Sequence, residues 1–123
     1  MRIKQIQIEQ DSGKSFHDPK ETLIDLNRCG IGLLEIVTEP DFSSSAEVAS
    51  FVNEAHKILV SIGVCSGRLE EGALRVDANV SVQRNEEAFK GIRTEVKNLN
   101  SIKSIQRAIK YELDRQVISR RSY

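Results

Sequence analysis

Alternation of apolar and polar residues is the clearest pattern in this chain, and it is strongest over two stretches of the C-terminal half. Every second residue from 74 to 82 is apolar, and residues 92–97 repeat the alternation. Because strand side chains point alternately to opposite faces, each stretch predicts a strand with one apolar and one polar face. A polar loop separates the two stretches, so we expect them to pair as antiparallel strands.

The polar faces of this predicted pair collect most of the charged chemistry of the chain. They hold Arg75, Asp77, Asn79 and Ser81 on the first strand and Arg93, Glu95 and Lys97 on the second. A solvated outer face is the ordinary interpretation of such a surface. Carboxylates spaced among cations would also suit a metal–phosphate group, so both interpretations stay open.

The N-terminal region predicts two further strands joined by polar turns. Residues 3–9 alternate, which indicates a strand with Glu9 near its end. Residues 10–15 have turn chemistry, in which Gly13 is free to adopt positive φ. The segment up to residue 21 stays polar and is expected to form a loop, and residues 22–26 predict a short strand.

One almost wholly apolar run, residues 33–37, contains a single charged residue, Glu35. A strand that is apolar on both sides is normally buried on both, so we expect Glu35 in an apolar environment. A charge there is costly unless it is paired or bound to a metal. Two interpretations remain: Glu35 is satisfied by a neighbouring arginine, or it is a metal ligand.

Two amphipathic helices complete the pattern. Ser44 and Glu47 form a capping box before a predicted helix over residues 45–62, which Gly63 ends. A second helix is predicted over residues 101–117, with Asn100 or Ser101 as its cap. The apolar stripes, at three- and four-residue spacing, are Val48, Phe51, Val52, Ala55, Ile58, Leu59 and Ile62, then Ile102, Ile105, Ile109, Leu113 and Val117.

The element order is therefore strand, strand, strand, helix, strand, strand, helix. It predicts an α+β fold in which two helices cover one face of a mostly antiparallel sheet, packed on Val76, Ala78 and Val80. We expect residues 1–118 to form one partial domain and residues 119–123 to form a disordered tail.

Length and composition narrow the possible functions. A chain of 123 residues forms at most one domain with a modest core. Lys plus Arg and Asp plus Glu both number 18, so no global field attracts nucleic acid or membrane and an anion site must be local.

Cys29 and Cys65 are far apart without zinc-site spacing, which fits a reducing compartment. No run is long enough to span a bilayer, and no targeting segment is recognisable.

Two other candidate features carry little weight. Gly13-Lys14-Ser15 lacks the earlier glycine of a phosphate-binding loop, because that position is Ile8. Lys14 beside a backbone turn would still be able to touch a phosphate. His17 and His56 are isolated in polar surroundings and are predicted to be surface residues. Oxygen ligands without Cys or His favour Mg²⁺ over zinc.

Five segments, taken together, resemble one family. They are IKQIQIEQDSGKS, TLIDLNR, GLLEIVTEPD, EEGALRVDANVSV and EVKNLNS, and the resemblance extends over about residues 2–116. The chain is similar to the B subunits (GatB family) of the aspartyl/glutamyl-tRNA amidotransferases, and the segment QIEQD resembles the mitochondrial branch. The resemblance implies a partial catalytic domain with a glutamine synthetase/guanido-kinase-like fold.

The resemblance also implies an activity, cofactors and partners. Family members use ATP and Mg²⁺ to phosphorylate the side-chain carboxyl of misacylated Glu-tRNA(Gln), as ATP-dependent carbon–nitrogen ligases. Ammonia from the A subunit, a glutaminase, then displaces the phosphate to give Gln-tRNA(Gln), and the small C subunit clamps the other two together. The mitochondrial matrix is the implied location, or else the cytoplasm, with no membrane partner.

Matching the family motifs residue by residue assigns roles. Glu35 and Glu95 match metal-binding glutamates, and Glu9 is expected to join them because the next position, often a second glutamate, is Gln10 here. Asp77 is expected to act with Glu35 and Glu95 in catalysis. The cations expected to meet ATP are Lys14, Arg75, Arg93 and Lys97.

Two departures from the family pattern affect these expectations. The family has an N-terminal part before this stretch, which supplies further site residues, and a helical and tail region after it. We therefore expect a fragment that is inactive alone and exposes apolar surface. The alternative is a catalytically silent interaction module of the same fold.

Overall fold

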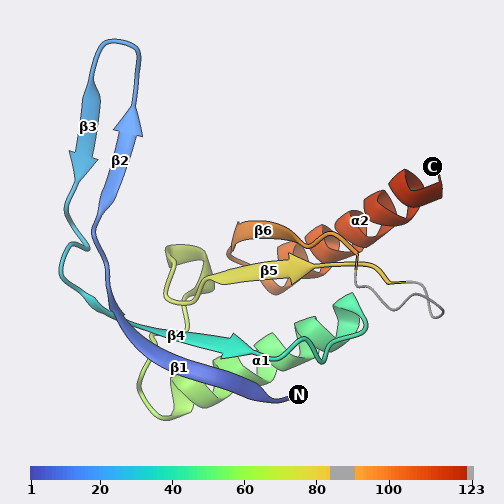
Figure 1. Ribbon diagram of the computed structural model, residues 1–123. Coiled ribbons are helices and arrows are strands. Elements are labelled where there is room, and N and C mark those ends of the chain that lie inside the picture. The colour runs from blue at the N-terminus through green and yellow to red at the C-terminus, as the bar shows by residue number, and fades with distance from the viewer. Residues whose placement is uncertain (84–90, 122–123) are drawn as a thin grey trace. The chain divides into compact units, whose positions relative to one another are not determined.

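The computed structural model describes residues 1–83 and 91–121, and these form an α+β arrangement (Figure 1). All pairings of the described strands are antiparallel, as expected, but they form three separate two-stranded sheets rather than one. The chain divides into two units, Met1–Asp41 and Phe42–Tyr123. The first contains strands only, and the second contains both helices.

The first unit consists of two strand pairs. Strand β1 (Ile3–Gln10) pairs with β4 (Gly32–Thr38), and β2 (Lys14–His17) pairs with β3 (Thr22–Asp25) (Figure 1). The prediction of a loop up to residue 21 was wrong for β2. That segment has too few apolar residues to show a strand pattern, and its extended form depends on hydrogen bonds to β3.

Asp11 organises the junction between the two pairs. Its carboxylate accepts a hydrogen bond from the Gly13 amide at 2.9 Å and lies 3.1 Å from the Arg28 guanidinium. Its backbone amide also donates to the Ile31 carbonyl oxygen, and its backbone carbonyl oxygen accepts from the Gly30 amide, just before β4. Gly13 has φ +84°, as predicted, and a Cβ there would lie 2.6 Å from the Asp25 carbonyl oxygen, so the turn requires glycine.

None of residues 1–41 is buried. Ile6, Ile8 and Leu34 are 58%, 85% and 53% exposed, so the expectation that residues 33–37 are buried on both faces was wrong. A two-stranded sheet has no layers on either side unless other elements cover it, and such a sheet is marginal in water. Apolar surface is thus exposed in this unit, as expected.

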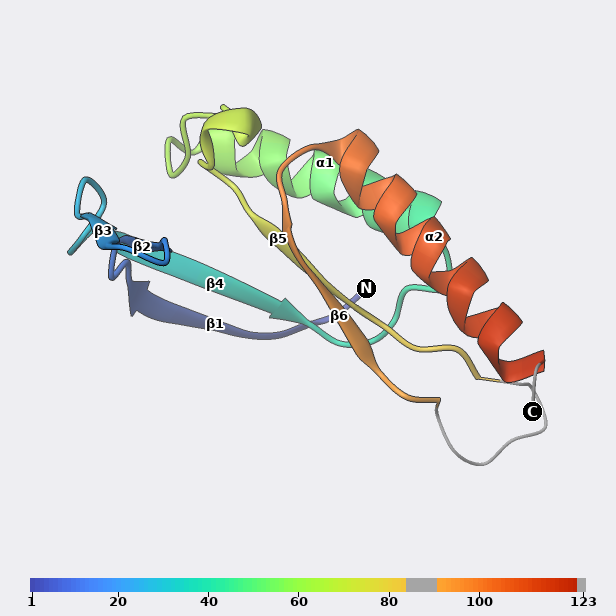
Figure 2. The same ribbon diagram turned by 90° about the horizontal axis from the view of Figure 1, so that it is seen from above.

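The second unit has a hydrophobic core. Helix α1 (Ser45–Ser61) packs against α2 (Ile102–Arg121), and α2 packs against β5 (Val76–Val80) and β6 (Thr94–Leu99). A short 3₁₀ helix, Leu69–Glu71, lies between α1 and β5. Both helices lie on one side of the strand pair, as predicted (Figure 2). The buried cluster is Val52, Ala78, Val80, Leu99, Ile105 and Ile109.

Local signals explain the ends of α1. The Ser44 side chain accepts a hydrogen bond from the Glu47 amide at 3.2 Å, which confirms the predicted cap. The Glu47 carboxylate accepts from the Ser43 amide at 2.8 Å, so the return bond reaches one residue further back than in a standard capping box. Gly63 follows the helix at φ +75°, where its amide bonds to the Val60 carbonyl.

The helix stripes differ from the prediction at their C-terminal ends. Ile58, Ile62 and Val117 are exposed. Buried in place of Val117 are two polar residues, Glu112 and Gln116. Helix α2 continues through residues 119–121, where a disordered tail was expected; residues 122–123 of that tail lie outside the described residues. Neither helix has the combination of length and apolarity that crossing a bilayer requires, among the described residues.

Candidate functional site

One face of the β1–β4 pair holds a line of amide and carboxylate side chains. Gln5, Gln7 and Glu9 follow one another at alternate positions of β1, as the pattern predicted. Glu35 of β4 lies directly opposite Gln7 in the strand register. The alternation and the register therefore bring Glu9 and Glu35 to the same face of one sheet.

The Gln7 amide connects the two carboxylates. Its Nε2 donates one hydrogen bond to Glu9 Oε1 at 2.9 Å and another to Glu35 Oε2. Its Oε1 accepts from Gln5 Nε2 at 2.9 Å, which fixes which side of the amide faces the carboxylates. Glu9 and Glu35 each use one oxygen in this way, and the other oxygen has no partner among the described residues.

This donor set fits a hard divalent cation. Two ionised carboxylates on one accessible face supply the oxygen ligands that Mg²⁺ prefers. The interpretation in which an arginine satisfies Glu35 was wrong within the described residues, where its partner is the neutral Gln7. Gln7 is neutral, so it supplies no charge opposite to that of the two carboxylates.

The β5–β6 pair presents the second set of predicted residues. Asn79 pairs with Glu95 in the register, and Lys97 Nζ lies 3.4 Å from Glu95 Oε2. The predicted alternation is correct, with one change: Ile92, expected on the apolar face, precedes β6 and is 85% exposed. The polar face is exposed, so this ion pair contributes little to stability.

Asp77 has a local structural role. Its Oδ1 accepts a hydrogen bond from the Asn98 amide at 2.9 Å, at a register irregularity between Val76 and Ala78. Asn98 there has φ +61°, which is uncommon for a residue other than glycine. The irregularity turns Leu99 to the core face, so Asp77 supports the packing of β6 whatever its catalytic role.

The remaining predicted cations lie at strand ends. Arg75 precedes β5, Arg93 precedes β6, and Lys14 begins β2 opposite Asp25. All three are exposed. Exposure at strand ends leaves them accessible to a phosphate, and equally to water.

The structure brings some of the predicted site residues together. In the first unit, Glu9 and Glu35 are both hydrogen-bonded to Gln7. In the second unit, Asp77, Glu95 and Lys97 lie on one strand pair. No three His, Cys, Asp or Glu side chains form a metal-sized group within residues 1–83 and 91–121. The three-glutamate set Glu9, Glu35 and Glu95 stays a prediction.

Two residues have roles that sequence reasoning missed. Gln7 was placed on the correct face by alternation, but its contact with Glu35 depends on a strand pairing between distant segments. His56, predicted at the surface, is partly buried, and its Nε2 lies 2.8 Å from the Gly67 carbonyl oxygen. It tethers the loop that follows α1 and has no role in the carboxylate site.

Comparison with known proteins gives one consistent result. The family model described as "GatB/GatE catalytic domain" matches residues 1–120. The chain is 55% identical over 119 residues to the aspartyl/glutamyl-tRNA(Asn/Gln) amidotransferase B subunit of Rickettsia typhi, covering 95% of this chain and 24% of that protein. It is 56% identical over 119 residues to the human mitochondrial glutamyl-tRNA(Gln) amidotransferase B subunit, covering 95% of this chain and 21% of that protein.

A mitochondrial relative from Aedes aegypti, with the same name as the human protein, is 52% identical over 118 residues and is covered to 22% of its length. The chain thus spans between a fifth and a quarter of these relatives. The match to the catalytic-domain model nevertheless extends over nearly the whole chain, and we conclude that this chain belongs to the GatB/GatE catalytic-domain family.

Proposed function

We propose that this chain supplies part of the catalytic domain of the B subunit of a glutamyl-tRNA(Gln) amidotransferase. The observation that supports the proposal is the match of residues 1–120 to the GatB/GatE catalytic domain. The proposed reaction is ATP- and Mg²⁺-dependent phosphorylation of the glutamate side chain of Glu-tRNA(Gln), followed by amidation. The proposed partners are the A and C subunits, and mitochondria are the proposed location, in keeping with the named human and mosquito relatives.

The proposed chemistry has two steps. A glutamate carboxylate oxygen attacks the γ-phosphorus of ATP, the bond to the β-phosphate oxygen breaks, and an acyl phosphate and ADP form. Ammonia delivered by the glutaminase (the A subunit) then attacks the acyl carbon. Phosphate leaves with the electron pair of the C–O bond, and the nitrogen loses a proton to give the amide.

The residues of this chain have distinct parts in that proposal. Glu9, Glu35 and Glu95 would hold Mg²⁺, which would supply positive charge to the phosphate oxygens. Lys14, Arg75, Arg93 and Lys97 are the cations proposed to bind phosphate. Asp77 is proposed to act with the glutamates while its Oδ1 supports Asn98.

A direct assay tests the proposed activity. The protein is assembled with the A and C subunits and mixed with Glu-tRNA(Gln) and ATP labelled at the γ-phosphate, without an ammonia donor. We expect Mg²⁺-dependent transfer of label to the aminoacyl group. Absence of transfer, together with no calorimetric heat on titrating the chain with Mg²⁺ and ATP, would favour the catalytically silent module instead.

Gln7 provides a test of the carboxylate pair alone. Gln7→Leu removes the amide that holds Glu9 and Glu35 together, and we expect Mn²⁺ or Mg²⁺ affinity to fall about 10- to 100-fold. Metal titration of the full chain by calorimetry measures this without turnover. Gln106→Leu, an exposed glutamine of α2, is the matched control and should bind metal normally. Unchanged affinity in the Gln7 variant would contradict a positioning role.

A further inference from the structure

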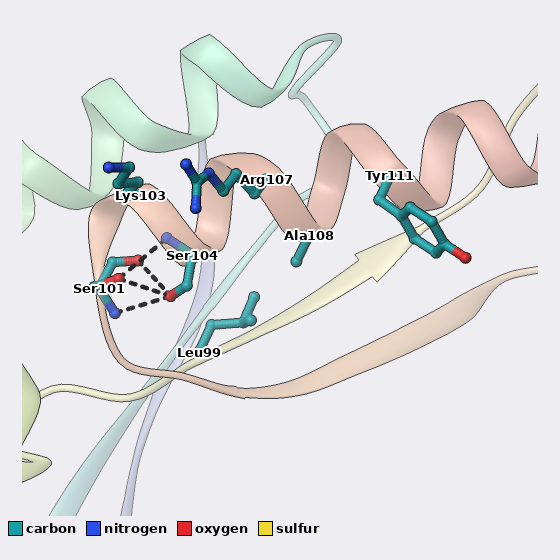
Figure 3. A pocket seen from close by; sticks show the side chains of 7 residues that line it. All are labelled: Leu99, Ser101, Lys103, Ser104, Arg107, Ala108 and Tyr111. Carbon is teal, nitrogen blue, oxygen red and sulfur yellow. Dashed lines mark hydrogen bonds between the residues drawn. The ribbon is translucent and has the colours of Figure 1, made fainter.

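A pocket of about 470 Å³ lies over the N-terminal half of α2, within the second unit (Figure 3). Its lining residues are Leu99, Ser101, Lys103, Ser104, Arg107, Ala108 and Tyr111. Leu99 and Ala108 supply the apolar part. Lys103, Arg107 and Tyr111 follow one another at four-residue intervals, so they lie on one side of the helix.

The two cations of this pocket, Lys103 and Arg107, are exposed and have no ion pair within residues 1–83 and 91–121. Other lysines on the helices do have one: Lys57 lies 2.7 Å from Glu54, and Lys110 lies 3.1 Å from Asp114. In a chain of zero net charge, Lys103 and Arg107 thus form a local positive site, which the N-terminal end of the helix dipole reinforces.

The two serines of the pocket are hydrogen-bonded to each other. The Ser101 hydroxyl donates to Ser104 Oγ at 2.9 Å, and the Ser104 hydroxyl donates to the Ser101 carbonyl oxygen at 2.9 Å (Figure 3). These bonds cap the start of α2. Tyr111 is 70% exposed, and its ring has no aromatic partner among the described residues.

We propose that this face of α2 binds an RNA strand, with Lys103 and Arg107 on phosphates and Tyr111 stacked on a base. The inference rests on the proposed function, in which the substrate is an aminoacyl-tRNA. Two cations about 6 Å apart along the helix suit consecutive anionic groups. An exposed aromatic ring one turn further suits a nucleobase and gives an acidic peptide nothing comparable.

The chemistry of the pocket also sets its selectivity. Phosphate contacts and stacking hold RNA without reading bases, because sequence is read by hydrogen bonds to base edges. Of the polar lining residues, Lys103 and Arg107 are assigned to phosphates here, and the hydroxyls of Ser101 and Ser104 are hydrogen-bonded at the start of α2. The site therefore tolerates any sequence, and its affinity falls steeply with salt.

Fluorescence anisotropy of a labelled tRNA(Gln) transcript with the full chain tests this inference. We expect Lys103→Ala with Arg107→Ala to weaken binding at least tenfold and to reduce the slope of log affinity against log salt by about 1.5. Tyr111→Ala should weaken RNA binding about tenfold. Tyr111→Phe keeps the aromatic ring and should bind RNA as tightly as the wild type. Lys57→Ala, the matched control on α1, should bind normally.

The outcomes separate this inference from the proposed function. Unchanged affinity and slope in the double variant would overturn the RNA site. Competition by polyglutamate as effective as by RNA would overturn it too, and would indicate a protein partner. In the assembled complex, the double variant should raise the KM for Glu-tRNA(Gln) and leave kcat unchanged. Absence of phosphoryl transfer by the wild-type complex would instead refute the proposed function. It would leave the RNA site untouched, because RNA binding is measured without turnover.

Discussion

Replacing Glu35 by glutamine is expected to lower the rate of Glu-tRNA(Gln) phosphorylation about a thousandfold or more. The amide keeps the shape of the carboxylate and removes the charge that would hold Mg²⁺. Loss of several kcal/mol of transition-state stabilisation corresponds to a rate change of this size. Glu95→Gln should have a comparable effect. The measurement is transfer of labelled phosphate in the assembled complex under single-turnover conditions.

Three controls make this result interpretable. Glutaminase activity should survive, because its chemistry belongs to a different polypeptide, the A subunit of the proposed complex. Glu21→Gln alters an exposed acid of the same unit and should leave phosphorylation unchanged. Glu35 is itself exposed on β4, so its substitution should shift the melting temperature little. Normal turnover in a folded Glu35→Gln or Glu95→Gln enzyme would refute the metal assignment.

The helices were predictable because their signals are local. Ser44 with Glu47 begins α1 and Gly63 follows its end, within a few residues of each boundary. The alternation of β5 likewise identified the core face, which includes Ala78 and Val80. In each case, the decisive interaction is between residues near one another in the chain or follows directly from side-chain periodicity.

The division of the strands into three pairs was not predictable in this way. Strand β2 exists because it pairs with β3, and Glu35 meets Gln7 because β4 pairs with β1 across 28 positions. Such pairings depend on tertiary structure, and a nearly apolar run indicates burial even where no layer covers it. The face of Glu9 was predictable from alternation, whereas its neighbour across the sheet was not.

The end of α2 shows a second kind of failure. The three- and four-residue spacing pointed to Val117 as a core residue, but the structure buries Glu112 and Gln116 and exposes Val117. Apolar spacing cannot identify a buried position that is polar, because burial there depends on hydrogen bonds to other elements. Gln116 Nε2 donates to the Val80 carbonyl oxygen at 3.1 Å, and its Oε1 accepts from the Val82 amide at 3.1 Å.

Glu112 is the charged centre of this network. Arg115 donates two hydrogen bonds to its carboxylate, at 2.7 and 2.8 Å, and Thr94 and Gln116 donate to Oε1. Chiefly because of the Arg115 bonds, followed by those from Thr94 and Gln116, the pKa of Glu112 is lowered from 4.5 to about 2. The ionised form is therefore more stable in the folded protein than in the unfolded chain.

Acid should therefore weaken the second unit in a defined range of pH. The contribution of Glu112 is complete above its unfolded pKa of 4.5, and it disappears as the pH falls towards about 2. At 1.36 kcal/mol per pKa unit, the ionised network contributes about 3 kcal/mol to the free energy of unfolding at neutral pH. Glu112→Gln should lower the melting temperature by about 10 °C at pH 7.

The comparison of pH profiles, rather than one melting temperature, isolates Glu112. The stabilising contribution of Asp41 is lost in the same acidic range, because the Arg2 hydrogen bonds lower the pKa of Asp41 to about 2. The wild-type curve therefore falls for more than one reason, and only the difference between wild type and Glu112→Gln reports the network. That difference should be constant above pH 5 and shrink steadily below it. Asp114→Asn, on the exposed side of the same helix, should parallel the wild type. A constant difference down to pH 2 would show that the variant loses packing and not the charge of Glu112.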